Sequence, residues 1–433
     1  MTSRRTFLKT VTFKAAVLKA TVFSTATLAT SAWPGISTAK SAPFPDSASF
    51  SDPDFWAEIQ RMYKISSSRI YLNTGGLGPA SEPVLTRYRD ETDRLQTMSE
   101  TGHRLFDIAR ADVAAFFGAD PDEIAFNRNA TEGNSTIAGG LELSSGDEII
   151  IDASAHPGGA IPWLNQLKRN GVRVRLFQPD SIRQETTLDR IEELITPRTR
   201  VIQISHVTAP TGILLPVKQI AEIAQRRGCW FHIDGAQSAG MLPVDLHDIG
   251  CDSYATSGHK WLGAPHGTGI LYIRSNRMNE VWPTEVGAYS DAGYHLPDTF
   301  EYFPTARRHE SGTRNAPLVC ATQEACLFMS HIGMERVRAR GLELTAQLRA
   351  GLEQIDSVEI LTPKSDVMRG SILTFRSQKM AFQELNQALA RDFSLRLRIV
   401  TEQDLNAIRV SLHVFNSEEH VALVVEGVRT ILG

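Results

Sequence analysis

The chain has 433 residues, 42% of them hydrophobic and 22% charged, a composition that is typical of a globular protein with a large core. Its net charge is −4, and six basic residues precede the first acidic residue, Asp46, so the remainder is more acidic still and disfavours a nucleic-acid partner. No stretch after the N-terminal region is apolar for long enough to span a bilayer.

The N-terminus carries a twin-arginine sequence, Ser3-Arg4-Arg5-Thr6-Phe7-Leu8-Lys9. The residues that follow, to about residue 32, are rich in Ala, Thr, Val and Leu, but Lys14 and Lys19 make them too polar for a stable membrane span. We therefore predict that residues 1–40 are a removable signal read by the twin-arginine translocation machinery, with cleavage near residues 30–32 or 37–39. The predicted location is periplasmic.

Residues 41–80 are predicted to form an N-terminal segment that packs with a C-terminal domain. An amphipathic helix is expected over residues 51–66, and a short strand at 70–72 breaks into the glycine-rich loop Asn73-Thr74-Gly75-Gly76. Glycine allows a ligand to approach the backbone closely, which marks this loop as a candidate binding segment. Helical patterns follow at residues 84–97 and 105–117.

A strand at residues 124–126, a polar turn and a helix to residue 141 come next. This order presents the free N–H groups and the positive dipole end of a helix to an anion. Ala130 and Thr131 are therefore candidate phosphate ligands, with an ordinary helix cap as the alternative interpretation.

Strands and helices then alternate, with strands expected at residues 148–151, 172–176 and 199–204. Such alternation predicts a mostly parallel sheet with helices on both faces, whose functional side chains gather where strands end. His156 and His206 follow two of these strands, although a histidine in such a position can also be structural.

Two further segments contain the candidate catalytic residues. A buried strand at residues 229–233 ends in Asp234-Gly235-Ala236-Gln237, and Ser257-Gly258-His259-Lys260 lies downstream. A buried aspartate needs a cation, and a lysine in a dry pocket loses its proton and becomes a nucleophile toward an aldehyde. Lys260 is thus a candidate Schiff-base amine, while His232 receives no role.

The Asp-x-Ala-Gln and Ser-x-His-Lys motifs resemble those of the class V aminotransferase family of fold-type I enzymes that use pyridoxal 5′-phosphate (PLP). The resemblance implies an α/β fold: a large PLP-binding domain over residues 81–332, with a mostly parallel seven-stranded sheet, and a smaller α+β domain over residues 333–433. It places Asp234 at the cofactor's ring nitrogen, His156 over the ring and Gln237 at the phenolic oxygen. Ser257 and His259 join Ala130 and Thr131 at the phosphate.

The resemblance also implies a homodimer with composite active sites, because Thr313 lies in a Gly-Thr loop that reaches the other subunit's phosphate in this family. Asn73 and His206 are expected near the substrate. For the substrate carboxylate the candidates are Arg398 and Arg396, which alternation would place on one face, with Arg314 as a third. The ending Arg409-Val410-Ser411 resembles the family's C-terminal motif, and the loop-rich residues 282–308 are expected to face substrate or a partner.

The four cysteines, Cys229, Cys251, Cys320 and Cys326, show no metal-binding spacing, and no metal site is expected. We predict that they are buried free thiols, with a disulfide as the alternative. Cysteine desulfurases need a cysteine in the loop before the Arg-x-Ser strand, and this chain has none after Cys326.

The loop Ser205-His206-Val207-Thr208 and the C-terminal ending instead resemble isopenicillin N epimerase and its relatives. With the export signal, this implies a periplasmic PLP enzyme that modifies the glutamate-derived side chain of a pyoverdine-type peptide siderophore. The alternatives are an exported aminotransferase or amino-acid epimerase with another small-molecule substrate, and a PLP-binding remnant without activity.

Overall fold

The computed structural model describes residues 53–433, so the predicted export signal at residues 1–40 lies outside the described residues. The α-helices are α1 (Pro53–Arg61), α2 (Glu82–Met98), α3 (Arg104–Phe116), α4 (Ala130–Gly140), α5 (Pro157–Asn170), α6 (Gln184–Leu194), α7 (Val217–Arg227), α8 (Leu246–Ile249), α9 (Ala316–Ile332), α10 (Met334–Leu352), α11 (Phe382–Phe393) and α12 (Glu418–Leu432). The strands are β1 (Ile70–Tyr71), β2 (Ile124–Asn127), β3 (Glu148–Asp152), β4 (Arg173–Phe177), β5 (Thr199–Ser205), β6 (Trp230–Asp234), β7 (Ser253–Ser257), β8 (Gly269–Ile273), β9 (Asp291–His295), β10 (Thr299–Tyr302), β11 (Val358–Ile360), β12 (Ile372–Ser377), β13 (Leu395–Arg396), β14 (Arg398–Val400) and β15 (Ala407–Ser411).

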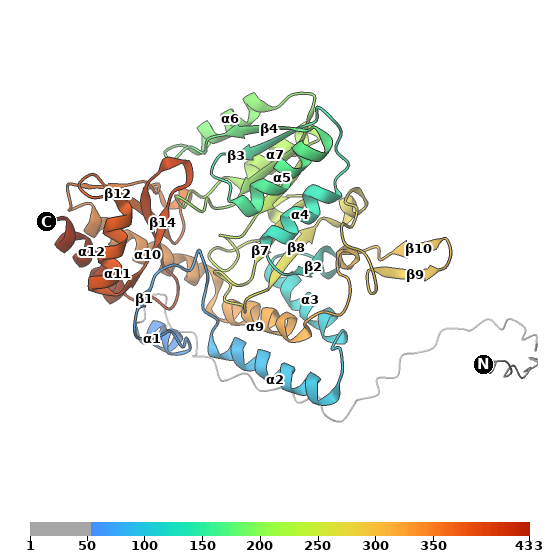
Figure 1. Cartoon of the computed structure of the whole chain (residues 1–433), viewed down its shortest axis with the longest axis horizontal. Helices are drawn as coiled ribbons and strands as arrows, with labels where there is room; N and C mark the ends of the chain where they lie inside the picture. Colours follow the sequence, from blue (N-terminus) through green and yellow to red (C-terminus); the bar gives the residue numbers. More distant parts are fainter. Residues whose placement is uncertain (1–52) are drawn as a thin grey trace, which may run out of the picture. The chain divides into compact units, whose positions relative to one another are not determined.

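A seven-stranded sheet in the order β2-β8-β7-β6-β5-β3-β4 forms the centre of the larger part of the fold. Strands β7, β6, β5, β3 and β4 are parallel, and β8 runs antiparallel to both of its neighbours. The prediction of an α/β fold with a mostly parallel seven-stranded sheet is therefore confirmed. Figure 1 shows this sheet with helices packed on both of its faces.

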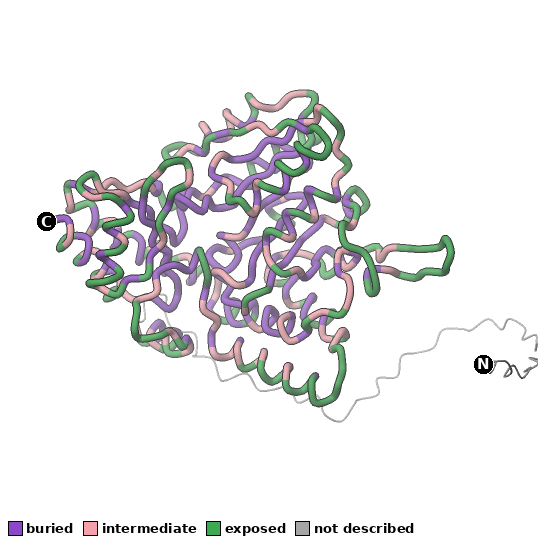
Figure 2. Tube along the Cα trace, viewed as in Figure 1, coloured by how far each residue is buried: buried purple, intermediate pink, exposed green. Residues whose placement is uncertain are grey.

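The sheet is buried on both faces because its strands are continuous apolar runs. Alternate residues face opposite sides: Ile150 belongs to one hydrophobic cluster, with residues of α3, α7 and α9, whereas Ile149 and Ile151 belong to another, with residues of α4 and α5. Figure 2 shows the buried trace concentrated along these strands. The carboxyl ends of the parallel strands are thus fixed between two packed layers.

The C-terminal residues form a four-stranded antiparallel sheet in the order β11-β12-β15-β14. Its core contains leucines and valines of α10, α11 and α12. The N-terminal strand β1 pairs in parallel with β13, and Asn73 bridges to Ser411 of β15. Residues far apart in sequence therefore meet beside the C-terminal sheet. Over residues 53–433, no helix combines the length and apolar character needed to cross a membrane.

The expectation of a loop-rich span at residues 282–308 is wrong in part. An antiparallel hairpin, β9–β10, lies within it and projects from the sheet region (Figure 1). Nearly every residue of both strands is exposed, so neither face has the apolar alternation by which strands are recognised.

Two arginines and a glutamate connect α3 and β2 to the segment that precedes α9. Glu310 accepts hydrogen bonds from Arg110 at 2.8 and 3.1 Å and from the Phe126 N–H at 2.7 Å, and it pairs with Arg314 at 3.3 Å. Glu310 and Arg110 are both buried. The carboxylate therefore holds the loop that carries Thr313.

We expect Glu310→Gln to lower the free energy of unfolding by about 3 kcal/mol, because it leaves the buried Arg110 cation without a counter-charge. Urea denaturation followed by circular dichroism measures this loss. Asp392→Asn, which removes an exposed ion pair with Arg391, is the control and should leave the midpoint nearly unchanged. Equal midpoints for Glu310→Gln and the wild-type protein would contradict the role assigned to Glu310.

Candidate active site

The predicted site residues gather where the parallel strands end. Asp234 is the last residue of β6, Lys260 follows the neighbouring strand β7, His206 follows β5 and His156 follows β3. In open α/β sheets the carboxyl edge is where ligands bind. The topology thus brings residues separated by about a hundred positions to one edge.

The Lys260 side chain is partly buried, and within the described residues its amine forms no hydrogen bond or ion pair. Burial lowers the pKa of Lys260 to about 8, with the nearby Arg409 and Arg398 acting in the same direction and Asp234 opposing them. An amine in this state is a good nucleophile near neutral pH.

This pKa predicts the pH dependence of the amine's reactivity. Since only the neutral amine attacks an aldehyde, the rate of adduct formation should rise about tenfold per pH unit below the pKa and level off above about pH 8. Borohydride trapping of an aldehyde on the protein, with Lys260→Ala as control, measures this rate. A midpoint above about pH 10, as for an exposed lysine, would contradict the assignment.

Asp234 is buried and has only neutral donors. Its Oδ2 accepts from Asn134 Nδ2 at 3.1 Å and its Oδ1 accepts from the Ala236 N–H at 3.0 Å. No ion pair to Asp234 is formed within residues 53–433. A buried carboxylate without a paired cation provides a place for a protonated ring nitrogen.

The start of α4 differs in one respect from the prediction. The N–H of Ala130 donates to Ser257 Oγ at 2.9 Å, so this donor already has a partner, and the role of Ala130 at the phosphate stays a prediction. Asn129 Oδ1 caps the helix by accepting from the Glu132 N–H. Thr131 is an exposed residue at the first turn of the helix, where the helix dipole favours an anion.

Ser257 lies against this helix start, and His259 follows it by two residues. Ser257 is buried, and His259 has a buried Nδ1 without a hydrogen-bond partner. Burial, together with the Lys260 and His266 charges, lowers the pKa of His259 to about 4, so its ring is neutral at pH 7. The arrangement offers hydroxyl and imidazole groups to a phosphate.

The other predicted cofactor ligands occupy defined positions. His156 caps α5, its Nδ1 accepting from the Gly158 N–H at 3.0 Å. Part of the residue is open to solvent, but desolvation by the surrounding protein and the Lys260 charge lower its pKa. Gln237 is buried, donates to the Gly75 carbonyl at 2.8 Å and accepts from Trp261 Nε1 at 2.8 Å. His206 is buried with an unpaired Nδ1.

The residue that sequence reasoning missed is Arg409, in the middle of β15. Only 1% of it is exposed, and it donates to the Ala209 carbonyl at 2.8 Å and to Asn73 Oδ1 at 3.1 Å, but it forms no ion pair within residues 53–433. Burial and the neighbouring Arg398 charge lower its pKa. A buried guanidinium without a carboxylate is suited to bind one from a ligand.

The predictions for Arg396 and Arg398 need correction. The chain changes sheets at Leu397, so Arg396 pairs with Tyr71 in β1 while Arg398 lies opposite Arg409 in β15. Alternation within one strand therefore does not apply. Arg396 is exposed and donates to the Leu397 carbonyl, and Arg398 is ion-paired with Glu402.

Thr313 and Arg314 lie in the segment that precedes α9, apart from the strand ends that carry Asp234 and Lys260. Thr313 is exposed and lines a cavity of about 340 Å³ together with Gly267 and Thr268. Arg314 pairs with Glu310 and donates to the Phe126 carbonyl, so its guanidinium already has partners. The structure therefore does not support Arg314 as a substrate ligand.

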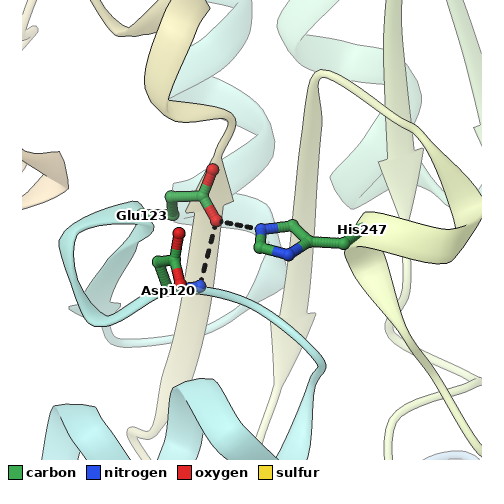
Figure 3. A group of neighbouring side chains, drawn as sticks. All are labelled: Asp120, Glu123 and His247. Carbon is green, nitrogen blue, oxygen red and sulfur yellow. Dashed lines mark hydrogen bonds and ion pairs between the residues drawn. The ribbon is translucent and has the colours of Figure 1, made fainter.

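A second cluster of titratable groups comprises Asp120, Glu123 and His247 (Figure 3). Burial alone would raise the pKa of Glu123, but the N–H groups of Asp120 and Ser275, with His247, hold it below its usual range. Glu123 Oε2 contacts His247 Nε2 at 2.6 Å and the Asp120 N–H at 3.1 Å. The Glu123 carboxylate thus forms part of the cap of this short helical turn.

Comparison with known proteins agrees with this geometry. The family model of aminotransferase class V matches residues 80–424. The chain is 28% identical to a probable cysteine desulfurase of Methanothermobacter thermautotrophicus and 29% identical to isopenicillin N epimerase of Streptomyces clavuligerus, each over 87% of this chain and 98% of the relative.

Solved structures show the same fold. The cysteine desulfurase CsdA of Escherichia coli superimposes with a TM-score of 0.78 at 22% identity, over 87% of this chain and 99% of the other. A lysine-to-alanine variant of the cystine C–S lyase C-DES, with glycine covalently linked to its PLP cofactor, has a TM-score of 0.78 at 25% identity, over 85% of this chain and 98% of the other.

PLP is the cofactor of this group of enzymes, and the residues present here fit it. Lys260 supplies a partner-free amine, Asp234 an unpaired buried carboxylate, and Thr131, Ser257 and His259 neutral groups at a helix start. Because the family match covers most of the sequence and the site has these groups, the chain belongs to the class V aminotransferase family of PLP-dependent enzymes.

Proposed function

We propose that this chain is a periplasmic PLP-dependent enzyme that modifies the amine-bearing, glutamate-derived side chain of a pyoverdine-type siderophore. The observation that carries the amine chemistry is the grouping of Lys260, Asp234 and the unpaired Arg409, which influence one another electrostatically. The N-terminal Arg4-Arg5 sequence supports the periplasmic location.

When bound, PLP condenses with primary amines and draws electrons from the adjacent carbon. In this chain Lys260 Nζ is the group that accepts and returns a proton at that carbon, since its pKa of about 8 lies close to neutral pH. Asp234 holds the proton at the ring nitrogen. Arg409, oriented by Asn73, binds a substrate carboxylate.

We expect Arg409→Gln to abolish the enzyme's discrimination between an amino acid and its amide. Adding either to the loaded wild-type enzyme should change the visible absorbance, with binding about a hundredfold tighter for the free carboxylate. Arg396→Gln, which replaces an exposed arginine of β13 in a different sheet, is the control and should keep this preference. Preserved discrimination in Arg409→Gln would remove Arg409 from the substrate site.

Desulfuration is not favoured despite the relatives' names. All four cysteines are free and buried, and burial raises the pKa of Cys251 and Cys326 far above its usual range. The loop between β14 and β15 carries Glu402, paired with Arg398, and no thiol. A nucleophilic cysteine is therefore not available where that reaction needs one.

Mass spectrometry of the siderophore from a deletion strain tests the substrate. Retention of the unmodified glutamate side chain, restored to the modified form by the wild-type gene but not by Arg4→Lys with Arg5→Lys, supports the proposal. An unchanged siderophore would favour the second candidate, an exported aminotransferase or amino-acid epimerase. That alternative draws on the similarity to isopenicillin N epimerase.

We also propose that the working unit is a homodimer. Thr313 is exposed beside the cavity next to the start of α4, where a group from a second subunit would reach a phosphate. Mixed dimers of Lys260→Ala and Thr313→Ala subunits should regain part of the activity that each variant lacks. A fully active monomer in analytical ultracentrifugation would contradict this.

A further inference from the structure

A buried row of hydrogen bonds leads to Asp234. Trp230, His232 and Asp234 alternate along β6 and so face the same side of the sheet. Trp230 Nε1 lies 2.8 Å from Ser253 Oγ, Ser253 Oγ lies 2.8 Å from His232 Nδ1, and His232 Nε2 lies 2.8 Å from Asn134 Oδ1. Asn134 Nδ2 completes the row by donating to Asp234 Oδ2 at 3.1 Å.

The direction of every bond in this row follows from its ends. Asn134 Nδ2 donates to the Gly158 carbonyl and to the Asp234 carboxylate, neither of which is a donor. Asn134 therefore presents its oxygen to His232, whose Nε2 must carry a hydrogen. Burial lowers the pKa of His232 to about 3, so the ring is neutral and Nδ1 accepts from Ser253.

We propose that His232 is a positioning residue for the cofactor: acting through Asn134, it keeps Asp234 oriented toward the ring nitrogen of PLP. This inference rests on the PLP role given to Asp234 above. It does not depend on the siderophore substrate.

The physical reason lies in the amide of Asn134. Were this side chain to rotate by half a turn, its oxygen would face the Asp234 carboxylate and repel it. The His232 Nε2–H prevents that rotation because it needs an acceptor, and a buried N–H without one is costly.

Two substitutions separate positioning from packing. His232→Phe keeps a flat ring but removes the donor, whereas His232→Gln retains an N–H donor in place of the ring Nε2. We expect His232→Phe to weaken PLP binding about tenfold, which corresponds to about 1.4 kcal/mol, and to shift the apparent pKa of the visible absorbance band. His232→Gln should restore most of both properties.

Val428→Ala, which creates a cavity in the buried face of α12, is the control for a general loss of stability. It should lower the melting temperature without moving the absorbance pKa. If His232→Phe binds PLP with wild-type affinity and an unchanged absorbance pKa, or if His232→Gln behaves like His232→Phe, the positioning role is wrong.

Nitrogen-15 NMR of the histidine rings tests the same inference in the wild-type holoenzyme, in which the row of hydrogen bonds is intact. We expect the His232 signals, assigned by their loss in His232→Gln, to show hydrogen on Nε2 and no titration between about pH 6 and 9. Hydrogen on Nδ1, or titration in that range, would overturn the proposed direction of the row. A failed siderophore assay would leave both readouts unaffected.

Discussion

Lys260→Ala should reduce turnover by on the order of 10⁴-fold or more, the largest effect of any single substitution in the chain. The variant loses both the covalent attachment point for PLP and the group that moves a proton at the substrate carbon. The partner-free amine with a pKa of about 8 is the observation behind this expectation. Single-turnover kinetics on the PLP-loaded protein measures the loss.

Lys218→Ala is the matched control, because Lys218 is exposed and paired only with Asp248 on the surface. It should leave turnover unchanged. A Lys260→Ala enzyme with turnover within tenfold of wild type would show that another group moves the proton.

Asp234→Asn should lower the rate of the chemical step by about 10²- to 10³-fold while leaving substrate affinity nearly unchanged. The amide keeps the shape, and its single oxygen can still accept from one of the two donors, Asn134 or Ala236, but it has no charge with which to hold a proton at the ring nitrogen. The loss should therefore appear in kcat more than in KM. Single-turnover kinetics separates the two.

Asp152→Asn provides a close comparison. Asp152 is also a buried carboxyl at a strand end, but burial raises its pKa to about 7 and it accepts from the Ser205 N–H. Since Asp152 is already partly protonated at neutral pH, Asp152→Asn should change the rate of the chemical step far less than Asp234→Asn does. Equal losses in both variants would indicate that Asp234 is merely a structural acid of the core.

Local sequence was sufficient for the central sheet and for the residues at its edge. An apolar strand that ends in a carboxylate is constrained by burial on both faces, so Asp234 could be placed before the structure was known. Lys260 follows the next strand for the same reason. These positions depend on parallel strands that end at one edge of the sheet, which the alternation of strands and helices predicts.

Other features depend on contacts that local sequence does not record. The change of sheets at Leu397 separates Arg396 from Arg398, although two residues apart on a continuous strand would share a face. The Ala130 N–H donates to Ser257, which is 127 positions away. Helix α9 received no prediction because most of its residues are buried, so no polar face marks the helical period.

The sequence around Arg409 contains a pattern from which its role as a binding residue could have been predicted. It is the only charged residue in the buried strand Ala407–Ser411, and a buried arginine needs an anionic or carbonyl partner. Its partners, Ala209 and Asn73, come from distant loops, and no acid among the described residues pairs with it. An isolated charge in an apolar strand was thus the sequence pattern that marks Arg409 as the proposed carboxylate-binding residue.

The central claim is that Lys260 carries the cofactor, and borohydride reduction of the purified holoenzyme tests it most directly. Proteolysis and mass spectrometry should then find the reduced PLP group on the peptide that contains Lys260. The other lysines within residues 53–433 should be unmodified; they are Lys64, Lys168, Lys218, Lys364 and Lys379. A stoichiometric adduct on one of those lysines, or no adduct in protein that has bound PLP, would contradict the assignment of Lys260 as the cofactor's attachment point.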